Sequence, residues 1–149
     1  MKINLGSGIE KKVGFINIDI SPKYNPEIVC DGLHLPLKEN SMDCVRAFDF
    51  LEHMPNDKRL DIIEEIYRVL KPGGKFQHHT PSTVGMGAFS DPTHLSFWNK
   101  NSWLYYCDDL GGIMRKTYGI KANFKVEHLQ DYDSGHGVIH THGVMYAVK

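Results

Sequence analysis

The chain has 149 residues, a formal net charge of -1, 41% hydrophobic residues and 23% charged residues. This length suits a single domain over residues 1–149, and the balanced charge gives no basic surface of the kind that binds nucleic acid. The three cysteines have no paired spacing, which favours a reduced compartment over a disulfide framework. No run approaches the roughly 18 apolar residues of a membrane span, and no signal peptide is recognisable. We therefore expect a cytoplasmic protein that does not enter membranes.

Short apolar runs separated by turn residues predict a sheet. The expected strands cover residues 2–5, 14–20, 27–30, 42–50, 75–80, 124–129 and 138–148. The last two strands are joined by the turn-like segment "DYDSGHG" and are expected to form an antiparallel hairpin. The earlier strands alternate with turns and a helix, an order typical of an α/β protein with a parallel sheet.

Helices are scarce in this pattern. One is predicted over 55–70, where apolar residues recur at three- and four-residue spacing and would form one buried face. That face comprises Leu60, Ile63, Ile66, Tyr67 and Leu70. The "KPGG" segment should end this helix, because Pro72 cannot continue it and the glycines would supply a left-handed cap. A second helix is expected over 100–110.

The ends of the first three predicted strands carry residues suited to an adenosine-like ligand. Ligands of open parallel sheets bind beyond the carboxyl ends of the strands. Gly6 and Gly8 would let backbone N–H groups approach a ligand closely, since neither has a side chain. Asp19 would reach two ribose hydroxyls, and Asp31 could accept from an adenine amino group while Leu33 covers the ring. Each of these residues is also common in ordinary turns, so the prediction depends on their occurrence in order at three strand ends.

The same ordered set resembles the motifs of class I S-adenosylmethionine-dependent methyltransferases. The similar segments are "INLGSG", "INIDIS", "CDGLHLPLKENSMDCVRAFDFLEHMP" and "EEIYRVLKPGGKFQHHTPS", in order within residues 2–82. A later segment, "DPTHLSFWNKNSWLYY", is similar to one in a bacterial and phage branch of that family. The resemblance implies a Rossmann-like α/β fold, with a seven-stranded mixed sheet in the order 3-2-1-4-5-7-6 and strand seven antiparallel. It also implies S-adenosylmethionine as the cofactor.

The resemblance assigns roles to individual residues. The cofactor-binding residues would be Leu5, Gly6, Ser7, Gly8, Asp19, Ile20, Asp31, Gly32, Leu33, Phe48, Asp49 and His53. The glycine turn would face the methionine part, Asp19 the ribose and Asp31 the adenine. Phe48 and Asp49 would flank the transferred methyl group.

The chain also departs from the family pattern. Asn4 stands where the family usually has an acid, two residues before its first glycine. The helix after the glycine turn has almost no room, and the helix that usually precedes strand one is missing, so the chain resembles a small, N-terminally truncated member. We expect the loop at 81–98 or a second copy of the chain, in a homodimer, to cover the cofactor. In this loop Gly85 and Gly87 would act as hinges. Its apolar cover would come from Met86, Phe89, Phe97 and Trp98.

Methyl transfer to an acceptor of low acidity needs a base as well as alignment. His94, in "DPTH", is the preferred candidate for the base, with Asp91 and Asp49 as further catalytic candidates. The alternative role for His94 is to fix its loop. His53 is interpreted as a structural residue rather than a base. His78 and His79 would point to opposite faces of their strand, so at most one of them can face the site.

Other chemistries fit less well. His136, His140 and His142 would face one side of a strand, but no carboxylate or thiol completes a ligand set, so no metal site is expected. Nucleic acid is disfavoured as acceptor, because "FDFL" stands where amino-group methyltransferases carry an Asn/Asp-Pro-Pro-aromatic motif. The sequence therefore predicts a methyltransferase for a small-molecule or saccharide-like acceptor. The alternative is a non-catalytic protein that binds S-adenosylmethionine or its demethylated product, S-adenosylhomocysteine.

Overall fold

The structure, a computed structural model, describes the backbone of residues 1–149 and all side chains except those of residues 109–111. The strands are β1 (Lys2–Leu5), β2 (Ile16–Asp19), β3 (Ile28–Val29), β4 (Met42–Phe48), β5 (Leu70–Pro81), β6 (Phe124–Asp133) and β7 (Ile139–Ala147). The α-helices are α1 (Arg59–Val69), α2 (Gly87–Ser90), α3 (Lys100–Leu104) and α4 (Asp108–Thr117). Short 3-10 turns occur at η1 (Pro22–Tyr24), η2 (Leu51–His53) and η3 (Asn56–Lys58). No helix among the described residues is long and apolar enough to cross a membrane.

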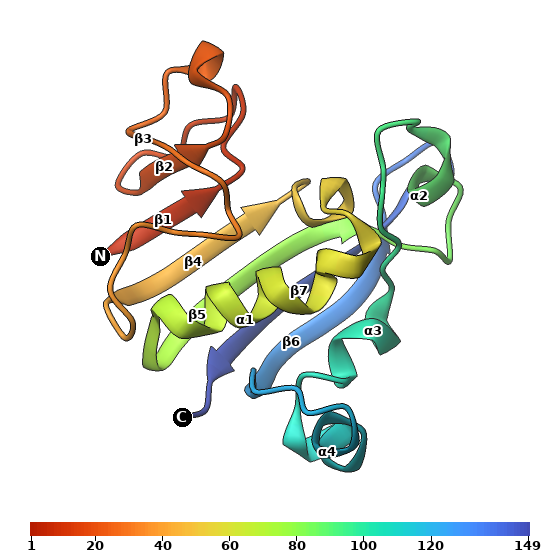
Figure 1. Cartoon of the computed structure of the whole chain (residues 1–149). Helices are drawn as coiled ribbons and strands as arrows, with labels where there is room; N and C mark the ends of the chain where they lie inside the picture. The colour runs from red at the N-terminus through yellow and green to blue at the C-terminus, as the bar shows by residue number, and fades with distance from the viewer.

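All the strands belong to one seven-stranded sheet in the order β3-β2-β1-β4-β5-β7-β6 (Figure 1). β7 runs antiparallel to both of its neighbours, while the pairs from β3 to β5 are parallel. The predicted topology is confirmed. The pairing sets Phe48 beside His79, His79 beside His142, and His140 beside Tyr132. Side chains from β4 to β6 therefore meet at one corner of the sheet.

α1 lies across one face of the sheet (Figure 1) and buries Ile62, Ile63, Ile66 and Val69 completely. The predicted face of this helix is partly wrong. Leu60 is 44% exposed. The helix begins at Arg59, after η3, and in its first turn Leu60 lines a surface cavity instead of the core. Tyr67 is only partly buried, and its ring packs edge-on against Phe124.

The end of α1 also differs from the prediction. Leu70 caps the helix in an extended conformation, with φ -68° and ψ 140°, and its N–H still donates to the Ile66 carbonyl. Leu70 is itself buried and pairs with Met42, so the chain passes directly from helix to β5. Gly73 adopts a φ of 70°, but it does so within β5, in the irregular stretch between the Leu70 and Lys75 pairs with β4. The left-handed glycine cap was therefore a wrong prediction.

The helix expected over 100–110 is divided into α3 and α4. Cys107 is extended, with φ -127° and ψ 135°, and both it and Tyr106 are buried. The break leaves the Tyr106 carbonyl free to accept the Phe124 N–H at 2.8 Å, which joins this segment to the start of β6. Of the predicted helix, the side chains at positions 109 and 110 lie outside the described ones.

The remaining differences concern strand ends. The strands predicted at 14–20 and 27–30 are shorter, because their ends form turns, and β4 ends at Phe48 rather than at residue 50. β6 extends to Asp133, beyond the predicted end at 129, because it pairs with β7 along its whole length. Neighbouring pairing, which local sequence does not report, decides each of these boundaries.

His78 of β5 lies inside the core. Its ring stacks on Trp103 with centroids 3.6 Å apart, and both ring nitrogens are buried without a hydrogen-bond partner among the described side chains. Burial lowers the pKa of His78 well below its usual value, and the neighbouring His142 and His79 lower it further. Gly143 of β7 makes room for this ring, since a Cβ there would lie 2.7 Å from two of its carbon atoms. The core therefore holds a neutral imidazole.

Substituting Gly143→Ala should destabilise the fold by about 1–3 kcal/mol, because the new methyl group overlaps the His78 ring in a filled core. Denaturation followed by tryptophan fluorescence measures the change in the free energy of unfolding. In a double variant with His78→Ala, the loss should be smaller than the sum of the two single losses. Additive losses would contradict the contact.

The buried His78 should also make stability depend on pH. In the unfolded chain its imidazole takes up a proton below about pH 6.5, whereas the folded chain keeps it neutral, so its stabilising contribution is complete above that pH and lost as the pH falls. Between about pH 7.5 and 5.5, the free energy of unfolding of the wild type should fall by roughly 1 kcal/mol more than that of a His78→Leu variant. Equal pH dependence in the two proteins would show that His78 is not held neutral.

Candidate cofactor and acceptor site

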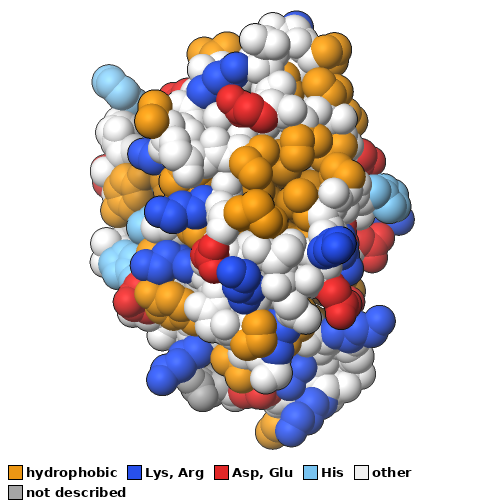
Figure 2. Space-filling model, turned by 90° about the vertical axis from the view of Figure 1, so that its left-hand side faces the viewer, with side chains coloured by type: hydrophobic (Ala, Val, Ile, Leu, Met, Phe, Trp, Pro, Cys, Tyr) orange, Lys and Arg blue, Asp and Glu red, His pale blue; other side chains and the backbone are white. Residues whose placement is uncertain are grey.

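A cavity of about 330 Å³ lies at the carboxyl ends of β1, β2 and β3. It is lined by Leu5, Gly6, Asp19, Ile20, Cys30, Asp31, Gly32, Phe50, His53 and Met54. Figure 2 looks onto the β3 edge of the molecule and shows hydrophobic side chains gathered in its upper half, with charged side chains around them. The volume falls within the ~300–1,000 Å³ of small-molecule pockets.

Gly6 shapes one wall of this cavity. It has a φ of 65°, and a Cβ there would lie only 2.5 and 2.7 Å from two carbon atoms of Phe50. The Phe50 ring also approaches Gly32, so it spans the floor from one strand end to another. Only a residue without a side chain allows both the turn and this contact.

The two predicted acids are already engaged in shaping their loops. One oxygen of Asp19 accepts the Gly8 N–H at 2.8 Å, and the other accepts the Ser21 N–H at 2.8 Å. Asp31 accepts the Leu33 N–H at 2.9 Å through one oxygen. Each carboxylate oxygen can accept a further bond, so both acids can still bind a ligand hydroxyl or amino group.

Asn4 is fully buried and bridges three segments. Its amide donates to the Glu10 carbonyl at 3.1 Å and to Asn17 at 3.0 Å, and its oxygen accepts from Arg46 at 2.7 Å. The Arg46 guanidinium also lies 3.8 Å from the centre of the Phe48 ring. Asn4 therefore holds the loop after the glycine turn. It stands where the family usually has an acid, and its side chain bonds Arg46.

Among the predicted cofactor residues, seven line the cavity: Leu5, Gly6, Asp19, Ile20, Asp31, Gly32 and His53. Phe48 does not, because it ends β4 with its ring against Arg46 and His79, and the lining aromatic is Phe50. Ser7, Gly8, Leu33 and Asp49 also lie outside the lining. Strand alternation alone puts Phe48 and Phe50 on the same face, so it could not distinguish them; the left-handed turn at Asp49 after the end of β4 does.

Asp49 follows β4 in a left-handed conformation with a φ of 48°, and its N–H donates to the His79 carbonyl at 2.9 Å. Its carboxylate lies 2.8 Å from His79 Nδ1, and the other ring nitrogen of His79 bonds the Tyr132 hydroxyl. His140 stacks on His79 with ring centroids 4.2 Å apart. These residues form a continuous chain from carboxylate to imidazole to phenol.

The charges of Asp49, His79 and Tyr132 depend on their contacts. Burial alone would raise the pKa of Asp49, but the hydrogen bond and charge of His79 outweigh it and lower that pKa. Burial and the neighbouring Asp49 raise the pKa of Tyr132. An ionised Asp49 only accepts, so His79 donates from Nδ1, and in the neutral imidazole Nε2 accepts from the Tyr132 hydroxyl.

His94 and Asp91 belong to a different group, beside η2. The His94 and His53 rings meet edge to face with centroids 5.2 Å apart, and Glu52 lies next to them. Glu52 is only 2% exposed, and burial together with the charge of Asp49 raises its pKa. The structure therefore separates the predicted catalytic residues into two neighbouring groups. Tyr132 and Glu52 were not predicted as site residues, whereas His79 was considered only as one of two adjacent histidines and His140 only in a metal set that was rejected.

The loop at 81–98 contradicts part of its predicted role. Trp98 is fully buried and stacks on Trp103, so it belongs to the core rather than to a cover. A Cβ on Gly85 or Gly87 would lie 2.7 Å from Ile139 and 2.5 Å from Val138, respectively, so these glycines allow close packing against β7 rather than acting as hinges. Mobility of this loop without a ligand, and the homodimer, stay predictions.

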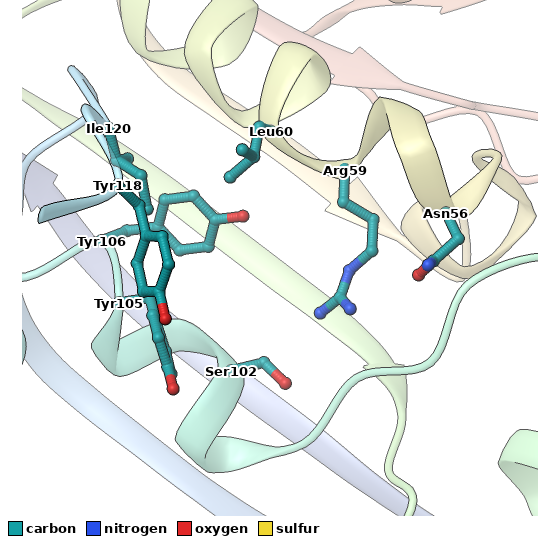
Figure 3. Close-up of a pocket in the computed structure, with 8 residues that line it drawn as sticks. All are labelled: Asn56, Arg59, Leu60, Ser102, Tyr105, Tyr106, Tyr118 and Ile120. Atoms are coloured by element: carbon teal, nitrogen blue, oxygen red, sulfur yellow. The ribbon is translucent and has the colours of Figure 1, made fainter. Parts of the chain in front are cut away.

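A second cavity of about 430 Å³ lies between α1 and the α3–α4 region. Figure 3 shows the Arg59 guanidinium directed toward Tyr106 and Ser102. Arg59 also lies 4.1 Å from the centre of the Trp98 ring, and burial raises the pKa of Tyr106 to about 12. This cavity contains none of the predicted site residues, and it is the reason that Leu60 is exposed.

Comparison of the sequence with protein families gives a match to a methyltransferase domain over residues 11–77. A probable S-adenosylmethionine-dependent methyltransferase of Mycolicibacterium smegmatis is 29% identical over 107 residues, which are 69% of this chain and 40% of that protein. A tRNA (carboxymethyluridine(34)-5-O)-methyltransferase of Schizosaccharomyces pombe is 32% identical over 59 residues, 39% of this chain and 26% of that protein. The chain thus spans less than half the length of both curated relatives.

Solved structures share the whole fold. A SAM-dependent methyltransferase from Methanosarcina mazei superposes with a TM-score of 0.70 at 14% identity, over 99% of this chain and 92% of that one. A 1,6-didemethyltoxoflavin-N1-methyltransferase of Burkholderia thailandensis, solved with its substrate and S-adenosylhomocysteine, gives 0.61 at 15% identity over 99% and 71%. S-adenosylmethionine is the cofactor of this family. The match to a methyltransferase domain, the relatives and the strand order together support a class I S-adenosylmethionine-dependent methyltransferase.

Proposed function

We propose that this chain binds S-adenosylmethionine in the cavity at the ends of β1, β2 and β3 and methylates a hydroxyl group of a small-molecule or saccharide-like acceptor. The observation that carries the proposal is the hydrogen-bonded chain from Asp49 through His79 to Tyr132, immediately after β4. It supplies a proton acceptor on the side of the sheet next to the cavity that would hold the cofactor.

The residues of the cavity fit the cofactor. Gly6 brings bare backbone to the wall, while Asp19 and Asp31 offer carboxylate oxygens at two neighbouring strand ends. Ile20, Phe50 and Met54 give apolar surface for an adenine ring. When bound, S-adenosylmethionine supplies an activated methyl carbon attached to a sulfonium. The chain has to hold that carbon in line with the acceptor oxygen and take up a proton.

Tyr132 and His79 can take up the proton without a net change of charge at Asp49. As the acceptor oxygen forms its bond to the methyl carbon, its proton passes to the Tyr132 oxygen and the Tyr132 proton passes to His79 Nε2. The bound cofactor would supply sulfur as the leaving group, which would retain the electron pair of its bond to the methyl carbon. Asp49 then stabilises the imidazolium formed on His79, as a carboxylate beside Nδ1 does in other relays.

The surroundings of the relay favour a neutral, hydroxyl-bearing acceptor. His140 stacks on His79 and holds the Ser134 hydroxyl at 2.8 Å through Nδ1. Burial and the charge of His79 lower the pKa of His140, so it adds no cation near pH 7. Arg46, a basic side chain that acts on Asp49, is bonded to Asn4. A polyanionic acceptor would need a cluster of such charges.

Asp19→Ala should weaken cofactor binding by about 1–3 kcal/mol, because two ribose hydroxyls lose a carboxylate partner. Calorimetric titration with S-adenosylhomocysteine measures this change. Glu27→Ala is a matched control, since Glu27 likewise accepts a backbone N–H of the β2 region, from Asn17, but lies outside the cavity. Unchanged affinity in the Asp19 variant would remove Asp19 from the site.

His79→Asn and Tyr132→Phe should each lower kcat by about 100-fold or more, because the transferred proton loses its acceptor or its path. The assay follows transfer of a labelled methyl group to a panel of phenols and saccharides. Affinity for S-adenosylhomocysteine should stay within about twofold in both variants, since neither residue lines the cavity. His136→Asn, in the exposed turn before β7, is the control histidine. Cofactor binding without methylation of any acceptor would favour the non-catalytic alternative.

A further inference from the structure

The group beside η2 is unusual because it joins a buried carboxylate to two imidazoles. One carboxylate oxygen of Glu52 and one ring nitrogen each of His53 and His94 lie within 4.8 Å of one another. Glu52 Oε2 is fully buried and has no hydrogen-bond partner among the described side chains. The Thr80 hydroxyl is also buried without a hydrogen bond of ordinary length, but it lies close enough to Glu52 to oppose part of the rise in the Glu52 pKa. An unpaired carboxylate oxygen at this depth is costly unless something positive faces it.

The protonation of both imidazoles can be read from their contacts. Nδ1 of His53 lies 3.2 Å from the Thr93 carbonyl oxygen, and Nδ1 of His94 lies 3.0 Å from the Ala88 carbonyl oxygen. A carbonyl oxygen only accepts, so Nδ1 donates in each ring, and Nε2 is the nitrogen available to an ion. Metal-binding histidines are held in this way, with one ring N–H on a backbone carbonyl and the other nitrogen free for the ion.

The arrangement of the two rings suits one tetrahedral ion. Their centroids are 5.2 Å apart and their planes meet at 70°. Two imidazoles bound through nitrogen at about 2.0–2.1 Å from a tetrahedral ion place their ring centres roughly 5 Å apart. The rings therefore need little movement to share an ion.

Asp91 can supply a further ligand. Its Oδ1 accepts the Thr93 N–H at 2.8 Å and the Thr93 hydroxyl at 2.6 Å, while its Oδ2 lies 3.8 Å from His94 Nε2. With Glu52 and Asp91 both ionised, the site would hold two negative charges, which a divalent cation neutralises.

The neighbouring group at Asp49 has a different geometry. His79 and His140 are stacked at only 12° between their planes, and parallel rings direct their lone pairs along separate lines. Both nitrogens of His79 are bonded already, to Asp49 and to Tyr132. The two groups therefore differ in kind, although both combine carboxylates with histidines.

We propose that Glu52, His53 and His94, with Asp91, form a binding site for a first-row divalent cation, with Zn²⁺ as the best match. Imidazole and carboxylate ligands in a four-coordinate arrangement suit Zn²⁺ and its neighbours rather than Mg²⁺ or Ca²⁺, which prefer oxygen ligands. The ion would fasten the loop bearing Asp91 and His94 to η2, and His53 would connect it to the cavity wall. This inference goes beyond the proposed function and does not rest on it.

The test is titration of the full chain, prepared without a histidine tag and stripped with a chelator, with Zn²⁺ by calorimetry and with Co²⁺ by visible absorption. We expect one Zn²⁺ per chain and a Co²⁺ spectrum of four-coordinate nitrogen and oxygen ligation without sulfur. Mg²⁺ and Ca²⁺ should not compete. Absence of stoichiometric binding, or a six-coordinate Co²⁺ spectrum, would overturn the proposal. Metal binding is measured without the cofactor and without methyl transfer. The metal-site proposal can therefore be wrong while the proposed function is correct, and the proposed function can be wrong while the metal site exists.

Variants locate the ion. Glu52→Gln keeps the shape of the side chain and removes its charge, and it should weaken Zn²⁺ binding by roughly 100-fold or more, as should His94→Gln. Asp91→Asn should weaken binding less, because it is the peripheral ligand. His140→Asn and His136→Asn are controls and should bind as the wild type does. If either control abolishes binding while Glu52→Gln does not, the ion lies elsewhere and the proposal is wrong. Should Glu52→Gln fail to fold, His53→Gln decides in its place.

Discussion

The alternation of side chains along β5 is the constraint on which both the core and the site depend. His78 and His79 are adjacent, and since neighbouring side chains of a strand point to opposite faces, one enters the core and the other joins the relay. β7 pairs with β5 along the same stretch and places Gly143 beside the first and His142 beside the second. If β7 shifted by one residue against β5, Gly143 would no longer lie beside His78, and a residue with a side chain would take its place against that ring.

The turn that follows β4 shows how the fold makes different chemistry from two similar acids. Asp49 and Glu52 are three residues apart, and both lie beside histidines. Asp49 is partly exposed and bonded to His79, so its pKa is lowered. Glu52 is buried near the charge of Asp49, so its pKa is raised. Environments that shift the pKa values of two neighbouring acids in opposite directions are frequent in functional sites.

The loop at 81–98 connects these features. Its first residues continue from β5, its last residues supply Trp98 to the core, and between them Asp91 and His94 reach η2. Leu95 and Ser96 both donate their N–H groups to the Glu52 carbonyl, at 2.8 and 3.0 Å. The backbone thus holds the loop against η2 from one side, and the side chains approach it from the other.

The sequence by itself predicted the strands, the glycine turn and the acids at the strand ends, because these depend on local periodicity and on motifs with a fixed spacing, and the resemblance to the methyltransferase family implied the strand order. It could not determine where α1 becomes β5, because Leu70 is drawn into the sheet by its pairing with Met42. It pointed to His94 as a base, whereas tertiary structure placed His94 beside Glu52 and brought His79 and Tyr132, 53 residues apart, to Asp49. Contacts over such separations depend on strand register and ring packing, and neither is written in the local sequence.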